Sequence, residues 1–87
     1  MIIRIATFSR KPDVPDDKMK AFRGWLKLQP GFRAAWHAHD SKSGKVASIS
    51  VWDDMASVIA MRDRTPPGGA MGLEPDEVTI YDDVRAF

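Results

Sequence analysis

The segment 2–9 carries apolar side chains on both faces of one predicted strand. Its content of β-branched and aromatic residues is typical of a strand. The apolar residues divide between the two faces, with Ile3 and Ile5 on one and Ile2, Ala6 and Phe8 on the other. A strand that meets water on one side alternates apolar with polar residues, so we expect this strand to be covered on both sides.

The chain has few ways to stabilise so small a fold. Its 87 residues form a single domain, 1–87. A chain of this size buries only roughly 60–65% of the surface that it exposes when unfolded. The absence of cysteine excludes disulfides and thiolate metal sites. We therefore expect the chain to find a second copy of itself and form a homodimer.

Two segments have helical periodicity. The first, 16–28, begins with two aspartates that suit the N-terminus of a helix as caps, and a Pro-Gly pair follows its end. The second, 55–64, follows Asp53 and Asp54 as caps, and Arg62 interrupts its apolar stripe. A cation near a helix C-terminus interacts favourably with the helix dipole, and ligand binding is the alternative interpretation of Arg62.

A single register sorts the segments 32–39 and 46–52 into one apolar and one mixed face. They flank the turn 41–44, whose glycine comes late in the loop. If Asp40 pairs with Lys45, the apolar face pairs Trp36 with Ile49, Ala34 with Val51 and Ala38 with Ala47. The mixed face then pairs Arg33 with Trp52, Ala35 with Ser50 and His37 with Ser48. This agreement between the two strands predicts a β-hairpin.

The order of the predicted elements is β-α-β-β-α-β. Three prolines and three glycines make 65–75 a loop, either a lid over a cleft or an arm on the other subunit. The last strand spans 78–87, with a bulge or an edge at Asp82 and Asp83. This order predicts an α+β, ferredoxin-like split β-α-β fold, with two helices on one face of a four-stranded antiparallel sheet. Pairing the other face with that of a second copy gives a dimeric α/β barrel.

Four features together resemble the antibiotic biosynthesis monooxygenase-like family of dimeric α/β barrels. They are the strand 2–8, the helix-ending Pro30-Gly31-Phe32-Arg33, the hairpin, and the junction Ser50-Val51-Trp52-Asp53-Asp54. The resemblance covers residues 1–64 and the last strand. It implies a homodimer. The family includes oxygenases that act on aromatic polyketides and quinols without a cofactor, haem-degrading enzymes, and members with no assigned activity.

The haem-degrading branch of that family depends on three residues that this chain lacks. That branch uses an Asn on the first strand, a Trp inside the second helix and a His just after it. This chain contains no Asn, the segment 55–64 contains no Trp, and no His follows His39. The sequence therefore excludes haem degradation by that mechanism.

His37 is the candidate general base, because a histidine titrates near the working pH and accepts a phenol proton. Trp36, Trp52 and Tyr81 are candidates for the walls of an aromatic pocket, and Arg33 for holding an anionic substrate oxygen. The alternative is structural, with the tryptophans in the core and Arg33 in a cation–π pair with Trp52. The predicted function is a cofactor-independent monooxygenase acting on a small aromatic or quinol-type molecule. The alternative function is a ligand-binding or structural homodimer without turnover.

Composition and residue spacing argue against a metal ion, a nucleic acid or a membrane as a partner. His37 and His39 share a strand face, but Asp40 points away from it and there is no third histidine, so no metal site is predicted. A net charge of +1 and the scarcity of aromatic residues on the two predicted central strands argue against nucleic acid. The chain shows neither a membrane span nor the start of a signal peptide, so we expect a cytoplasmic protein that binds no membrane.

Overall fold

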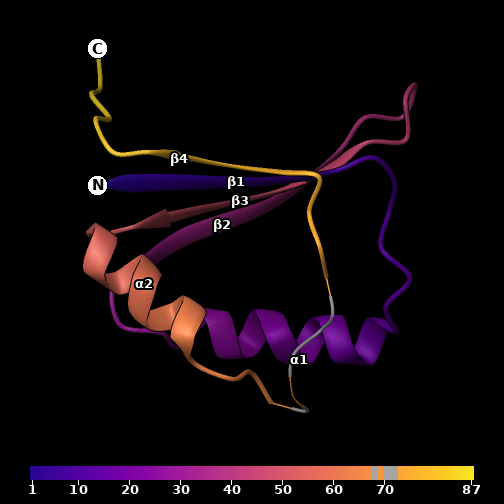
Figure 1. Ribbon diagram of the computed structural model, residues 1–87, viewed down its shortest axis with the longest axis horizontal. Helices are drawn as coiled ribbons and strands as arrows, with labels where there is room; N and C mark the ends of the chain where they lie inside the picture. Colours follow the sequence, from indigo (N-terminus) through magenta and orange to yellow (C-terminus); the bar gives the residue numbers. More distant parts are fainter. Residues whose placement is uncertain (68, 70–72) are drawn as a thin grey trace.

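The computed structural model describes residues 1–67, 69 and 73–87. Its elements are β1 (Ile2–Phe8), α1 (Asp16–Lys27), β2 (Phe32–His39), β3 (Val46–Trp52), α2 (Met55–Asp63) and β4 (Glu77–Tyr81). The strands form one antiparallel sheet in the order β2-β3-β1-β4. Both helices lie on the same side of this sheet (Figure 1). The predicted α+β, ferredoxin-like fold is confirmed.

The hairpin register is confirmed except at its first pair. The backbone N–H of Asp40 donates to the carbonyl of Lys45 at 2.9 Å, and the pairs from Ala34–Val51 to Ala38–Ala47 are as predicted. Phe32, however, pairs with Trp52, and the register shifts between Phe32 and Ala34. The prediction that Arg33 lies opposite Trp52 is therefore wrong. A bulge at Arg33 adds one residue to β2, which strict alternation along a strand does not anticipate.

The core lies at one end of the sheet, where α2 meets β1 and β3. Ile2, Trp52 and Val58 form its buried centre, and both Trp52 and Val58 are fully buried. The ring of Phe32 meets that of Trp52 edge-on, with 5.5 Å between ring centroids. The indole N–H of Trp52 donates to the Ser50 hydroxyl oxygen at 2.9 Å, so the one polar atom of this large side chain is satisfied.

The two helices begin differently. Asp54 caps α2 as predicted, because its carboxylate accepts from the backbone N–H of Ser57 at 2.8 Å. Helix α1 begins after Pro15, without a side-chain cap, and Asp16 and Asp17 lie in its first turn. There they still favour the positive end of the helix dipole, but the prediction that they act as caps is wrong. Proline, with its fixed φ, takes the boundary position instead.

The last strand is shorter than predicted, since β4 ends at Tyr81 and residues 82–87 are not a strand. Tyr81 pairs with Ile3, so an extension of β4 would run past the start of β1 and lose its partner. The proposed lid or arm 65–75 includes residues 68 and 70–72, which lie outside the described residues.

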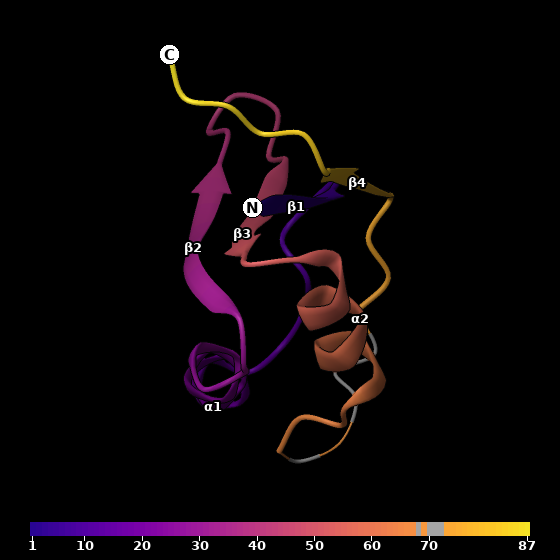
Figure 2. The ribbon, with the colours of Figure 1, turned by 90° about the vertical axis from the view of Figure 1, so that its left-hand side faces the viewer.

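The sheet face turned away from the helices is apolar and open. Strand alternation and the register place these residues on it: Ile3, Ile5, Ala34, Trp36, Ile49, Val51 and Tyr81. Trp36 is 56% exposed and Tyr81 is 51% exposed. Figure 2 shows both helices beneath the opposite side of the sheet. We call this surface the open face.

Candidate functional site

In the middle of the helix-facing side of the sheet, small and polar residues occupy β1, β2 and β3. Two rows of paired residues cross it: Ala35, Ser50, Arg4 and Ile80 in one, and His37, Ser48, Ala6 and Val78 in the other. Each row ends in a large apolar residue on β4, Ile80 or Val78, and Ile80 packs against the neighbouring core. We call Arg4, His37, Ser48 and Ser50 the polar centre. His37 and Ser48 are exposed, Arg4 is half-buried and Ser50 is buried, so the polar centre extends from the interior to the solvent. A cluster of polar side chains at such a boundary is a candidate ligand site.

Arg4 is the charged residue of the polar centre. It lies on β1 between Ile2 and Ala6, which are both buried and share its side of the sheet. Burial, and after it the positive charge of Arg62, lower the pKa of the Arg4 guanidinium. Within the part of the chain that the structure describes, Arg4 forms no ion pair. Its charge is therefore partly removed from water without a protein anion to balance it.

Arg62 approaches the polar centre from α2. It follows Val58 by one helical turn on the same side of that helix, and Val58 packs against Ile2 in the core. Arg4 follows Ile2 by one step on the same strand face, and in Figure 1 both α2 and β1 run away from the same end of the sheet. Each arginine therefore lies one step beyond a core residue of its own element. Arg62 is exposed, so its end of the polar centre reaches solvent.

His37, the predicted general base, belongs to the polar centre. It pairs with Ser48 on the helix-facing side and is exposed. Among the described residues, no side chain forms a hydrogen bond with its ring. A catalytic histidine is commonly oriented by such a partner, so a substrate would have to fix the position of this one.

The predicted ligand-binding residues do not meet at one place. Trp36 and Tyr81 lie on the open face, whereas Trp52 is buried in the core on the helix-facing side. Arg33 sits at the bulge and its Nε donates to the Asp53 carboxylate at 2.5 Å. It therefore forms an ion pair, and the cation–π interpretation with Trp52 is wrong.

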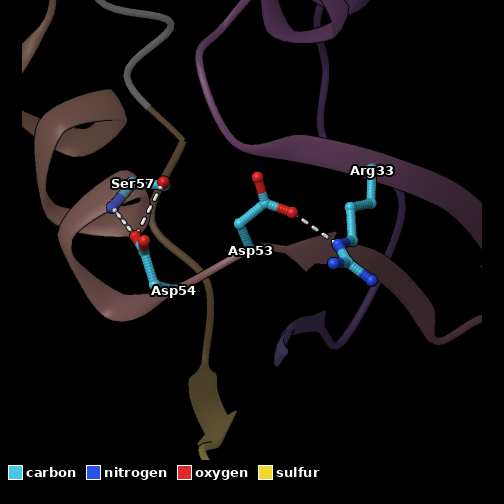
Figure 3. A network of polar contacts seen from close by, with 4 residues as sticks. All are labelled: Arg33, Asp53, Asp54 and Ser57. Carbon is cyan, nitrogen blue, oxygen red and sulfur yellow. Dashed lines mark hydrogen bonds and ion pairs between the residues drawn. The ribbon is translucent and has the colours of Figure 1, made fainter.

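Figure 3 shows the consequence of that ion pair for the junction between β3 and α2. Asp53 and Asp54 point in different directions, the first to Arg33 on β2 and the second to Ser57 in the first turn of α2. Both carboxylates are thus engaged by the protein itself. The junction is a structural feature, and we assign no ligand to it.

Two hollows lie at the other end of the sheet. An open groove of about 980 Å³ is lined by residues that follow β1 and precede β4: Phe8, Ser9, Arg10, Lys11, Pro12, Asp13, Val14, Leu73, Glu74 and Asp76. A smaller hollow of about 250 Å³ lies beside the hairpin turn and includes His39. In the described ranges, no three potential ligands among His, Cys, Asp and Glu gather to hold a metal ion. None of the helices described there is long and apolar enough to span a membrane.

Solved structures share this fold over almost the whole chain. One from Deinococcus radiodurans, named a putative antibiotic biosynthesis monooxygenase, is 15% identical with a TM-score of 0.69, covering 100% of this chain and 96% of that one. Rv0793 from Mycobacterium tuberculosis is 12% identical with a TM-score of 0.59, covering 98% of this chain and 96% of that one. No protein-family model and no curated protein matches the sequence. The resemblance to the monooxygenase-like family is confirmed at the level of the fold.

Arg4 is the functional candidate that sequence reasoning missed. The sequence does distinguish Arg4, because it is the charged residue in a strand whose other residues are mostly apolar. Arg62 interrupts the helical stripe, and the sequence alone relates it to the helix dipole or to a ligand. Nothing in the sequence relates the two residues, since they lie on elements far apart in the chain.

Proposed function

We propose that the protein is a homodimer that oxygenates a small aromatic or quinol-type molecule without a cofactor. The observation that carries the proposal is the polar centre, which combines a histidine with small residues beneath the helices. The likeness in fold to a protein named a putative antibiotic biosynthesis monooxygenase supports the same reaction class. His37 takes the role of general base, as its position in the polar centre allows.

The reaction needs no external reductant when the substrate is an anthrone. Removal of a proton gives an electron-rich carbanion that reduces dioxygen directly. The methylene carbon becomes a carbonyl with one oxygen atom, and the second oxygen atom leaves as water. The substrate thus supplies all four electrons, and the protein supplies the base.

The open face supports the homodimer. Its apolar residues come from all four strands of the sheet, and exposed apolar patches of this kind mark interaction surfaces. A second copy presenting the same face would cover Trp36 and Tyr81, and would give the opening strand the cover on both sides that its sequence requires. In such a dimer, Trp36 and Tyr81 pack at the interface and do not contact the substrate.

The alternative is a homodimer that binds a small molecule without turnover. It is favoured by the absence, among the described residues, of a side chain that orients His37. In this case the polar centre holds a ligand and the histidine provides only a hydrogen bond.

Oxygen consumption with an anthrone separates these functions. We expect His37→Ala to lower the rate by about a hundredfold, the lower range for loss of a general base. His39→Ala is the matched control, since it removes an exposed histidine from the same side of the same strand and should leave the rate unchanged. Equal rates for wild type and His37→Ala would remove His37 as the base. No turnover by the wild type, with binding retained, would favour the alternative.

A further inference from the structure

The segment 82–87, which follows β4, lies on the same side of the sheet as the open face. In Figures 1 and 2 it rises from the end of β4 away from both helices and crosses above the sheet from β4 toward β2. We call it the trailing segment. None of its residues is buried, and Phe87 is fully exposed. An aromatic ring so exposed gains free energy when it is buried against another apolar surface.

The smaller of the two hollows, of about 250 Å³, continues the open face at the opposite end of the sheet. Thr7, Ala47 and Ala38 line it and pair with one another across β1, β3 and β2. Strand alternation places this row on the same face as Trp36. A cavity of about 150 Å³ already admits a benzene ring, so the hollow is large enough for the ring of a phenylalanine.

The trailing segment and the hairpin turn 40–45 both rise on the side of the open face, at opposite ends of the sheet (Figure 1). Two copies whose open faces meet are related by a two-fold axis that runs either along the strands or across them. An axis along the strands stacks like upon like at each end and holds the sheets apart. An axis across the strands places each trailing segment beside the hairpin turn of the other copy. The sheets then approach to the usual spacing of about 10 Å.

The charges of these two elements are opposite. The hairpin turn carries Lys42 and Lys45 against one aspartate, whereas the trailing segment carries Asp82 and Asp83 against one arginine. The ion pairs of the described residues involve neither lysine, and Lys45 lines the hollow itself. Exposed charge pairs contribute little to affinity, but complementary charges select the orientation in which two surfaces meet.

We infer that the trailing segment of each copy docks on the hairpin turn of a second copy and places Phe87 in the hollow. The inference rests on the homodimer of the proposed function, and it specifies how the two copies are oriented. Because the contact is two-fold symmetric, each dimer forms it twice and buries two phenylalanine rings.

Sedimentation equilibrium of Phe87→Ser measures the contribution of these rings. We expect its dimer dissociation constant to exceed that of the wild type by at least about a hundredfold, because each of the two rings contributes at least about tenfold. Leu28→Ser is the matched control, since Leu28 is 82% exposed at the end of α1, on the other side of the sheet. It should leave the dissociation constant unchanged.

Disulfide trapping reports the orientation of the copies directly, because the chain contains no cysteine of its own. Phe87→Cys and Ala38→Cys chains are mixed in equal amounts and oxidised, and the linked residues are identified by mass spectrometry of proteolytic fragments. We expect disulfides that join the two kinds of chain, since a disulfide requires Cα atoms within about 7 Å of each other. Leu28→Cys mixed with Ala38→Cys is the control and should give no such product.

The possible failures of the inference and of the proposed function are distinguishable. A wild type that sediments as a monomer would overturn the homodimer and this inference together. A dimeric wild type whose dissociation constant is unchanged in Phe87→Ser would overturn the inference alone. Disulfides formed only between two Phe87→Cys chains would assign the axis along the strands and would also overturn it. None of these measurements involves turnover, so the oxygenase activity is tested separately by oxygen consumption.

Discussion

At the scale of single residues, Gly31 fixes how the first helix connects to the sheet. Its φ of 82° lies in the left-handed region, which side chains disfavour, and its carbonyl accepts the backbone N–H of Asp53 at 2.8 Å. A methyl group at this position would overlap the side chain of Ser57 in α2. Gly31 thus permits a close approach between the start of β2 and the second helix.

We predict that Gly31→Ala lowers the free energy of unfolding by about 3 kcal/mol, combining backbone strain with overlap against Ser57. Gly44→Ala is the matched control, because Gly44 has a similar φ of 78° but open space around it. Its loss should be only about 1 kcal/mol. Urea denaturation of the two variants measures the difference. Equal losses would show that Ser57 moves aside at no cost.

At the scale of elements, Asp54 determines where α2 begins. Hydrogen bonds from the backbone N–H of Ser57, and then from its hydroxyl, lower the pKa of the Asp54 carboxyl group. A carboxyl group whose pKa is lower in the folded state stabilises the fold above the pKa that it has when unfolded. That contribution is lost as the pH falls through the folded pKa.

We therefore expect Asp54→Ala to have a lower Tm than the wild type at pH 7, and the gap to close as the pH falls below about 4. Asp54→Asn keeps a capping oxygen and does not titrate, so it should stay closer to the wild type at pH 7. Thermal unfolding across this pH range tests both variants. A gap that stays constant with pH would show that the carboxylate charge contributes nothing to the cap.

At the scale of the whole molecule, the open face and the polar centre lie on opposite sides of one sheet. The open face carries exposed aromatic residues, whereas the polar centre carries a half-buried charge. This division gives the two faces different roles in the proposed function, one for the second copy and one for the ligand.

We predict that the wild type sediments as a dimer at micromolar concentration and that Trp36→Lys shifts it toward monomer. A lysine ammonium within an apolar interface would lose its hydration without a partner. Leu28→Lys is the matched control, since it makes the same kind of change at an exposed position at the end of α1, away from the open face. A wild type that sediments as a monomer would contradict the dimer.

The sequence by itself determined those features that depend on neighbours along the chain. Strand alternation and the turn predicted the hairpin register from Ala34 to Ala38, and an aspartate before an apolar run predicted the cap of α2. The order of elements then restricted the fold to the split β-α-β arrangement, which the sheet confirms. These features are local, so their physical cause lies within a few residues or across one turn.

Only the tertiary structure decided which face of the sheet the helices cover. The register had already placed Trp36 on one face and His37 and Trp52 on the other, but it does not say which face meets the helices. That choice places His37 and Arg4 on the helix-facing side, and Trp36 and Tyr81 on the open face. The bulge at Arg33 and the end of β4 at Tyr81 likewise depend on how strands meet their partners. The core cluster of Ile2, Trp52 and Val58 likewise depends on tertiary packing, because it brings distant segments of the chain together.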